Sequence, residues 1–476
     1  MSSYLKESLS EFWASNISKL GVIFLLIVVA VSIFTIATMP LDYGIRYWSN
    51  PRYWIENPKL AKPVWVNYIS QEKLLEHSVI SSETPTLQIS SPYYLKNYVM
   101  SYELKLSQFP TFIILRLENL TYYTSPPAVR LFIERPDNKM IPLYTLSIEK
   151  PLPEEESPYV RYLSEPKRIL LSGETAIAYS LSSFLLTEYN FSATPNEVMD
   201  IGYEKIIFGK PVNGSFQPLN GLYNVKVVLY SVDARDNIGK VAFVIGGRVY
   251  GLMGTDTLGR DLFQGLLFGF PVALLIGFVT SVITTVVGAV LGIVSGYVGG
   301  RVDDSIQRVA DIVNNFPQLP LLILLTFIFG GKIWIIVLVL VAFGWPSLTI
   351  ILRSMVLSIK NAPFVEAAVS IGASRLRIMM RHIFPQVAPY ILSQMIFYTP
   401  SAILAEAGLS FLGLGDPSMP TWGQILEYGF KNGAVYLGYW WWILPPGILI
   451  VFSAVTFVLL ALGLEPVVNP KLRRWR

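Results

Sequence analysis

The sequence predicts an α-helical membrane protein with six transmembrane helices and a large extracellular β-rich, sandwich-like insertion between helices 1 and 2. Its 476 residues are 52% hydrophobic and only 15% charged, with a mean hydropathy of +0.48. Soluble domains are about a quarter charged, so this composition indicates a chain that lies largely in a bilayer. Six stretches without Asp, Glu, Lys or Arg are long enough to cross a ~30 Å hydrocarbon core, which takes roughly 20 helical residues.

These six apolar stretches are the expected helices. In order, they are Leu20–Leu41, Leu262–Gly300, Ile312–Gly331, Ile333–Leu352, His382–Ala405 and Asn432–Leu464. The first has an apolar run longer than the ~7–15 residues of a signal peptide, and no small-residue cleavage site follows, so we expect it to be retained. The second and last include Gly-rich or polar loops at 295–300 and 432–438.

Lysine and arginine residues near the helix ends indicate the orientation, because cytoplasmic loops carry an excess of them. With the N-terminus inside, thirteen lie inside and three outside. The inside set is Lys6, Lys19, Arg301, Arg308, Arg353, Lys360, Arg375, Arg377, Arg381, Lys471, Arg473, Arg474 and Arg476, and the outside set is Arg260, Lys332 and Lys431. We therefore expect a multi-pass protein in the lipid bilayer of the plasma membrane, with both termini cytoplasmic.

This orientation divides the chain into three parts. Residues 1–41 hold the cytoplasmic N-terminus and helix 1, residues 42–250 form an extracellular domain, and residues 251–476 hold five helices and a cytoplasmic C-terminus. Residues 40–250 carry 21 Lys and Arg and 21 Asp and Glu, so this domain is neutral and long enough to bury its own core.

Short β-rich runs in this domain predict a β-sandwich. They are Thr111–Leu117, Val129–Glu134, Tyr223–Tyr230, and a hairpin in which Lys240–Ile245 and Arg248–Leu252 flank Gly246-Gly247. Asn119, Asn190 and Asn213 each begin an Asn-X-Ser/Thr sequon, which makes them candidate glycosylation sites.

Several functions are disfavoured by what the sequence lacks. There is no cysteine, and the two histidines lie far apart, so we expect no metal site. The excess positive charge belongs to the hydrophobic part of the chain, which disfavours nucleic-acid binding. Residues 254–259 have the spacing of a phosphate-binding loop, but Arg260-Asp261 replaces the required Lys-Ser/Thr pair. With no other such loop in the sequence, any ATP-driven step needs another polypeptide.

The loop between helices 4 and 5 is the most informative stretch. Pro363 suits the first turn of a short helix, Gly372 suits its end, and Ser374 can cap the helix that follows. Glu366 lies beside the small residues Ala367 and Ala368, which allow a close approach to a partner's groove. An ordinary interfacial helix–turn–helix is the alternative interpretation.

Three motifs in this order resemble a known family. Glu366-Ala367-Ala368 with Gly372 and the following His382-Ile-Phe-Pro385 is similar to the EAA loop of ABC importer permeases. Gly254-Thr255-Asp256-Thr-Leu-Gly259-Arg260-Asp261, and the stretch from Ala405 to Pro417 with Trp422-Gly423, resemble signatures of the C-type permeases of dipeptide, oligopeptide and nickel importers. The resemblance covers residues 251–464, together with the first helix. The family's segment between helices 1 and 2 is a few dozen residues, whereas this one has about 210.

The resemblance implies a type I ABC importer permease and its partners. These are a homologous second permease, two ATP-binding cassette subunits and an extracellular solute-binding protein. ATP and Mg would be bound by the partner subunits, so this chain itself would need no cofactor and no catalytic residue. Docking on the ATPase would involve Glu366, Ala367, Ala368, Gly372 and Pro385.

The transported solute and the outer loop leave alternatives open. The resemblance favours peptides or similar small oligomers, with oligosaccharides as the alternative. A secondary transporter would need buried carboxylates, and the candidates Glu406 and Asp311 lie at ends of the apolar stretches; a membrane sensor would not explain the EAA loop. Gly413, Gly415, Trp422 and Gly423 mark an outer loop, which is either a gate or a rigid turn.

Overall fold

The computed structural model describes residues 12–90, 92–105, 108–212 and 214–468. It divides into two compact units, Arg52–Asp261 and the combination of Met1–Pro51 with Leu262–Arg476, which we call the sandwich unit and the helical unit. The expected boundaries at residues 42 and 250 differ from these by about ten residues. The reason is that the chain after the first helix folds back on the helical unit, where Trp48 lies against Gly265, whereas residues 251–261 pack against residues 57–64.

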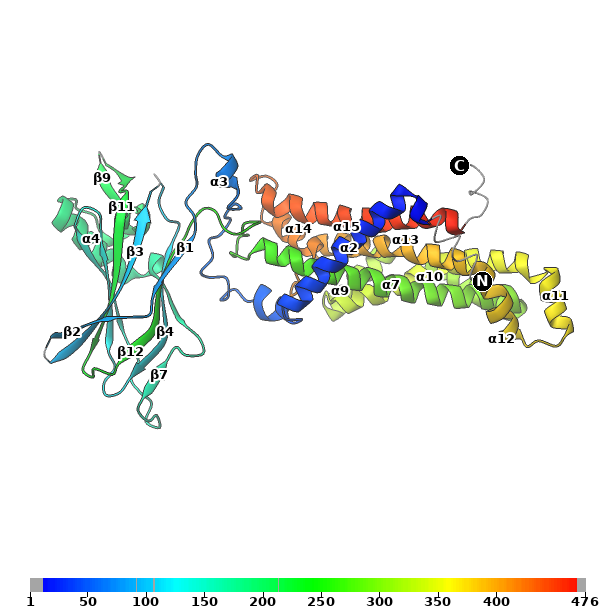
Figure 1. Cartoon of the computed structure of the whole chain (residues 1–476), viewed down its shortest axis with the longest axis horizontal. Coiled ribbons are helices and arrows are strands. Elements are labelled where there is room, and N and C mark those ends of the chain that lie inside the picture. The colour runs from blue at the N-terminus through cyan, green and yellow to red at the C-terminus, as the bar shows by residue number, and fades with distance from the viewer. Residues whose placement is uncertain (1–11, 91, 106–107, 213, 469–476) are drawn as a thin grey trace. The chain divides into compact units, whose positions relative to one another are not determined.

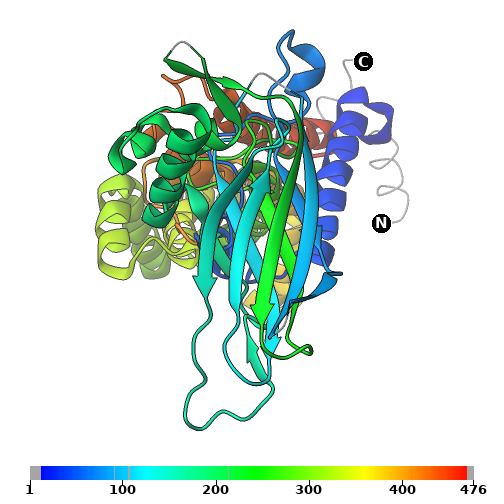
Figure 2. The ribbon, with the colours of Figure 1, turned by 90° about the vertical axis from the view of Figure 1, so that its left-hand side faces the viewer.

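Two antiparallel sheets form the sandwich unit (Figure 2). One sheet has the order β1 (Ser78–Ser82), β12 (Asn237–Ile245), β4 (Ile113–Tyr122) and β7 (Tyr159–Arg161), with β8 (Lys167–Leu170) also paired to β4. The other has the order β2 (Thr86–Ser90), β3 (Tyr93–Leu104), β11 (Gly221–Ser231), β5 (Ala128–Glu134) and β6 (Met140–Ser147). A separate hairpin joins β9 (Gly209–Val212) and β10 (Ser215–Pro218).

Alternate residues of these strands share one apolar core. In β5, Val129, Leu131 and Ile133 are buried, while the residues between them are not. The opposite sheet contributes Leu115 of β4 and Phe243 of β12 to the same core. Such alternation is what a pleated strand with one buried face requires, and it confirms that the insertion is β-rich.

The sequence prediction missed the helices of this unit. The helix α3 (Val66–Ile69) precedes β1, and α4 (Thr175–Tyr189), α5 (Pro195–Ile201) and α6 (Tyr203–Ile207) lie between β8 and β9. Ile177, Leu181 and Leu185 of α4 recur at helical spacing and are fully buried, so α4 covers part of the sandwich core. A capping box between Thr194 and Glu197, a signal that is present in the sequence, begins α5.

The chain enters and leaves the two-sheet sandwich at neighbouring points, His77 and Gly247, which we call the neck. A Cβ atom at Gly247, just after β12, would lie 2.2 Å from the backbone nitrogen of His77, just before β1. Val249 forms single parallel bridges to Lys62 and Glu76 instead of pairing with β12, so the predicted hairpin of Lys240–Ile245 with Arg248–Leu252 is wrong. Burial lowers the pKa of His77 to about 4, despite the opposing charge of Glu56.

Among its described residues, the helical unit contains five helices long and apolar enough to cross a membrane, or six if one bent pair is counted as a span. The long helices are α2 (Asn16–Thr38), α7 (Leu262–Val298), α10 (Ile333–Lys360), α13 (Phe384–Phe411) and α15 (Trp440–Val468), which run side by side (Figure 1). The short elements are the π-helical turn Gly44–Trp48, α11 (Pro363–Ser370), α12 (Arg375–Ile378), the π-helical turn Met379–Ile383 and α14 (Trp422–Lys431). The short helices α11 and α12 lie at one end of the bundle and α14 at the other (Figure 1).

The third expected helix, Ile312–Gly331, is wrong as a single element. The structure has α8 (Gly300–Asn315) followed by α9 (Gln318–Phe329), with a bend of 80° between them. Pro317 causes the break, because a proline disfavours helical backbone in the residue before it, and Phe316 is extended, with φ −78° and ψ 135°. The apolar run therefore belongs to the end of an amphipathic helix and to a second helix of only 12 residues.

Glycines allow α7 and α10 to pack closely. Gly288, Gly292 and Gly296 recur every four residues on α7, and a Cβ atom at these positions would lie between 2.7 and 3.0 Å from side-chain atoms of α10. This is the small-residue spacing that brings transmembrane helices together. The two helices therefore form a closely packed pair.

Candidate functional site at the two ends of α13

The EAA loop forms α11, α12 and the turn that leads into α13. Pro363 occupies the first turn of α11, where its missing N–H costs no hydrogen bond, and Glu366 also lies in that turn. The Glu366 side chain is exposed and forms no ion pair within the described part of the chain. Acidic residues are favoured at a helix N-terminus, so α11 keeps this unpaired charge at little cost.

Gly372 ends α11 in a Schellman motif. The N–H of Ala373 donates to the carbonyl oxygen of Ala368 at 3.1 Å, and the N–H of Gly372 donates to that of Val369 at 2.9 Å. Gly372 has φ +80°, as the sequence predicts for a helix-ending glycine, and a Cβ atom there would meet nothing within 4 Å. This glycine is therefore required by its backbone conformation and not by lack of space.

A second short helix follows at once. The hydroxyl of Ser374 accepts a hydrogen bond from the N–H of Arg377 at 3.4 Å, as expected of a capping residue. The π-helical turn then leads into α13, where Pro385 lies in the first turn with its ring exposed.

The loop has one buried face and one exposed face. Val365 and Ala368 of α11 are buried in a core that also contains residues of α7, α10 and α13. This corrects one expectation, because Ala368 packs inside the protein and only Ala367 is free to approach a partner. Ile371 is 85% exposed, and the apolar side chains of Phe364, Val369 and Leu376 are also exposed. A concentration of exposed apolar residues around an unpaired carboxylate is typical of an interaction surface.

A groove of about 570 Å³ lies beside α11. Its lining residues are Tyr297, Val298, Lys360, Asn361, Val365, Glu366, Val369, Ser370 and Arg375, from α7, α10, α11 and α12. The groove places charges of both signs next to the exposed face of the loop.

The loop between α13 and α14, which is expected on the outer side and which we call the outer loop, is packed much more tightly. A Cβ atom at Gly415 would lie 2.2 Å from Ser410 Oγ, and one at Gly423 would lie 2.5 Å from the carbonyl oxygen of Ala407. Gly413 has φ +82°, and Trp422 Nε1 donates to the carbonyl oxygen of Leu266 on α7 at 3.0 Å. These contacts favour the rigid turn over the gate.

Carboxylates take part in the same outer cluster. Glu406 lies inside α13, is 4% exposed, and accepts a hydrogen bond from Ser410 Oγ at 2.7 Å, so its expected position at a helix end is wrong. Asp416 faces Lys332 at 3.8 Å, and Glu427 pairs with Lys431. Asp311, the other carboxylate considered, is exposed on α8.

The motif before α7 forms a buried, hydrogen-bonded turn in the sandwich unit. Thr255 Oγ1 donates to the carbonyl oxygen of Pro58 at 2.6 Å and accepts from the N–H of Ala61 at 2.9 Å. Asp256 accepts from the Arg260 backbone N–H at 3.0 Å and pairs with the Arg260 guanidinium at 2.5 Å. Gly254 and Gly259 have φ +69° and +81°, and Thr255 forms a bridge with Asp261. The motif thus joins residues 58–61, which precede the sandwich strands, to residues 255–256, which follow them.

The remaining candidates lie in the sandwich unit. Asn119 is exposed within β4, Asn190 is exposed directly after α4, and Asn213 lies outside the described residues, as do Lys6, Lys471, Arg473, Arg474 and Arg476.

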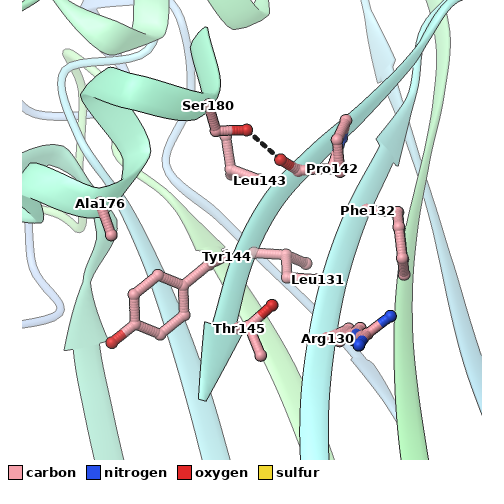
Figure 3. Close-up of a pocket in the computed structure, with 9 residues that line it drawn as sticks. All are labelled: Arg130, Leu131, Phe132, Pro142, Leu143, Tyr144, Thr145, Ala176 and Ser180. Carbon is pink, nitrogen blue, oxygen red and sulfur yellow. Dashed lines mark hydrogen bonds between the residues drawn. The ribbon is translucent and has the colours of Figure 1, made fainter. Parts of the chain in front are cut away.

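A hollow of about 400 Å³ between β5, β6 and α4 has one charged lining residue, Arg130, whose guanidinium stacks on Tyr230 at 4.6 Å (Figure 3). Ser180 of α4 closes one side by donating to the carbonyl oxygen of Pro142 (Figure 3).

Several apolar spans with an amphipathic helix–turn–helix at one end define a multi-pass membrane protein of the transporter class. The family model described as binding-protein-dependent transport system inner membrane component matches residues 288–474. The dipeptide transport system permease protein of Bacillus subtilis is 35% identical over 222 residues, which are 46% of this chain and 69% of that protein. The oligopeptide transport system permease protein of Salmonella typhimurium is 39% identical over 219 residues, 46% of this chain and 72% of that protein.

A solved structure of a methionine ABC transporter in inward-facing conformations matches 44% of this chain and 98% of its own chain, with 18% identity and a TM-score of 0.35. On the sequence matches, the chain belongs to the ABC transporter permeases and is a permease subunit of a binding-protein-dependent importer. The resemblance predicted from the three motifs is confirmed. An importer of this class works with an ATPase and a solute-binding protein.

Proposed function

We propose that this chain pairs with a homologous second permease and receives the work of ATP hydrolysis through α11. Two ATP-binding cassette subunits would hold ATP and Mg, and the chain itself would make and break no bonds. The observation that carries this proposal is the two-sided character of α11. Val365 and Ala368 fix the helix on the permease core, while Glu366 and Ile371 are exposed toward a partner.

Charge reversal at Glu366 tests the docking surface. Misplaced charge at a protein interface costs up to several kcal/mol, so Glu366→Lys should reduce copurification of the ATPase subunits and uptake together. Glu366→Gln is the matched control, because it removes the charge and keeps the shape. Full copurification with Glu366→Lys would argue for an ordinary interfacial helix–turn–helix.

The proposed orientation places both termini in the cytoplasm and the sandwich unit outside. Its support is the excess of Lys and Arg on one side of the spans. The chain has no cysteine, so single cysteines report cleanly. Ser172→Cys should react with an impermeant maleimide added outside intact cells, and Ser370→Cys only after the cells are opened. The reverse pattern would refute this orientation.

Peptides are the proposed solutes, because the two relatives described above are named as dipeptide and oligopeptide transport system permease proteins. Oligosaccharides are the second candidate. The partner binding protein decides between them, since peptide binding and not oligosaccharide binding by that protein is expected. Transport in ATP-loaded vesicles without an ion gradient separates both from a secondary transporter.

The sandwich unit is proposed to contact the binding protein or the second permease on the outer side. Its neutral charge and its own core support an independent domain. Glycans are proposed at Asn119 and Asn190. Replacing either by Gln should increase gel mobility if a glycan is present, whereas unchanged mobility after both replacements and after deglycosylation would reject modification.

A further inference from the structure

A partly buried polar cluster joins α7, α8 and α10. Arg353 of α10 donates from Nε and Nη2 to the two carboxylate oxygens of Asp303 on α8, each at 2.6 Å. Ser295 of α7 donates to the same carboxylate at 2.5 Å, and Gln307 Nε2 donates to Ser295 Oγ at 2.9 Å. Asp303 is only 7% exposed. Two-pronged bonds between a guanidinium and a carboxylate are among the strongest and most directional in proteins.

Without this cluster, little holds α8 in place. Two consecutive glycines, Gly299 and Gly300, connect it to α7 at φ +69° and +58°, and α8 has no side-chain cap at its N-terminus. Only Asp303 and Ala310 of α8 are buried. At its other end, the 80° bend separates it from α9. The ion pair is therefore the strongest polar tie of α8 to the bundle.

The other partner in the pair belongs to the body that carries α11. Leu352 and Val356 of α10, on either side of Arg353 in the sequence, share a core with Val365 and Ala368 of α11. The close packing of α7 against α10 makes this body stiff. A displacement of α11 by an ATPase must therefore displace α10, and with it the guanidinium of Arg353.

We propose that Asp303 and Arg353 are positioning residues that make α8 move with α10 and α11 during transport. Movement of α11 then reaches the bend between α8 and α9 through this ion pair. The inference rests on the proposed coupling role of α11, and it adds a second element to which the motion is passed. Ion pairs and rigid helices that keep their mutual arrangement while they move are a physical network that can carry such motion.

The first test separates coupling from folding. Asp303→Asn and Arg353→Gln should leave ATPase copurification and hydrolysis in place, while solute imported per ATP falls about 2- to 30-fold, the range that mutations in coupling networks produce. The double variant should be no worse than either single variant, because both remove the same interaction. Arg353→Lys, which retains the charge, should give a partial loss. Uptake and hydrolysis that fall in proportion, with an unchanged ratio, would overturn the proposal.

The second test locks α8 to α10. Ser347 Oγ of α10 donates a hydrogen bond to Asn314 Oδ1 of α8 at 3.2 Å, so Asn314→Cys with Ser347→Cys places two thiols on contacting side chains in a chain without other cysteines. A shift in gel mobility under non-reducing conditions shows when the disulfide has formed. If α8 and α10 move together, the oxidised complex imports solute at the rate of the reduced one. The disulfide should also restore the import ratio of Asp303→Asn. Transport that stops on oxidation and returns on reduction would overturn the proposal.

Failure of this inference and failure of the proposed function give different results. If the Glu366→Lys complex retains its ATPase subunits and its uptake, the proposed coupling role of α11 is wrong. The disulfide experiment reports whether α8 shifts against α10, and this result does not depend on where the ATPase binds.

Discussion

The connections at the two ends of α13 both contain glycine, for opposite reasons. Before α13, Gly372 has a left-handed backbone and open space around its α-carbon. After α13, Gly415 and Gly423 have no left-handed backbone, but an added Cβ atom would overlap a neighbour at 2.2 or 2.5 Å. The first glycine determines a direction of the chain, and the other two permit close contact.

The difference shows which end of the bundle is complete on its own. The outer loop is filled by its own chain, with Trp422 packed edge-on against Phe270 and hydrogen-bonded to α7. The EAA loop before α13 exposes Ile371, Leu376 and the carboxylate of Glu366. An apolar surface of this kind is stabilised when a partner covers it. The α11 end of the bundle is therefore the end that leaves an apolar surface uncovered within the described part of the chain.

The largest expected effect is at Gly372. Gly372→Val places a β-branched side chain at φ +80°, which costs roughly 1 kcal/mol or more and redirects the chain after α11. Uptake and substrate-stimulated ATP hydrolysis should be lost and ATPase copurification weakened, whereas the affinity of the binding protein for solute should not change.

Gly372→Asn is the matched control, because asparagine tolerates left-handed backbone better than other residues. It should retain most of the uptake. Wild-type uptake with Gly372→Val present in the membrane would contradict the coupling role of the inner connection.

The next effect concerns space at the outer connection. Gly423→Ala brings a methyl group within 2.5 Å of a backbone oxygen, and overpacking of this kind costs ~1–3 kcal/mol. Thermal unfolding of the purified complex should occur at a lower temperature, while ATPase copurification is kept. Gly408→Ala on α13 is the control, because a Cβ atom there meets nothing within 4 Å. Equal melting temperatures of the two variants would show that the outer loop shifts to accommodate the added methyl group at no cost in stability.

A smaller effect is expected at Trp422. Trp422→Phe keeps an aromatic ring near Phe270 but removes the donor to the Leu266 carbonyl oxygen, a bond worth ~1 kcal/mol. The melting temperature should fall less than with Gly423→Ala, and uptake measured below the transition should persist. A loss of uptake without a loss of stability would instead support a gate at this loop.

The smallest effect on uptake is expected outside both connections, and this prediction serves as a reference. Burial raises the pKa of Asp236 in the sandwich unit to about 6, and its neighbour Asp233 adds to the rise, whereas Lys96, Arg235 and a hydrogen bond from the Tyr123 backbone oppose it. Since the unfolded carboxyl ionises near its usual value, stability is lost as the pH rises from about 4 to about 6. Asp236→Asn should remove this loss and raise the melting temperature more at pH 7 than at pH 4. An equal change at both pH values would contradict the assignment, and uptake should not change.

The sequence predicted what local chemistry decides. The apolar runs locate α2, α7 and α10, and Pro363, Gly372 and Ser374 mark the bounds of α11 and the start of α12, because caps and breakers act over a single turn. The burial of Ala368 was not predictable, because two consecutive alanines do not reveal which of them faces the core. Pro317 indicates a break in the helix, but the sequence does not give the angle of the bend. That angle, 80°, depends on how α8 packs. The role of Thr255 also required the fold, because the Pro58 carbonyl oxygen to which it donates lies almost 200 residues earlier.

The neck has a consequence for the free energy of the whole chain. Because His77 and Gly247 lie together, the folded sandwich removes about 170 residues from the loop that links α2 to α7. Unfolding the sandwich would lengthen that loop by about two doublings, and each doubling costs ~0.6 kcal/mol in closure entropy. The sandwich therefore stabilises the helical unit by roughly 1 kcal/mol through chain statistics alone, without requiring any contact between the two units.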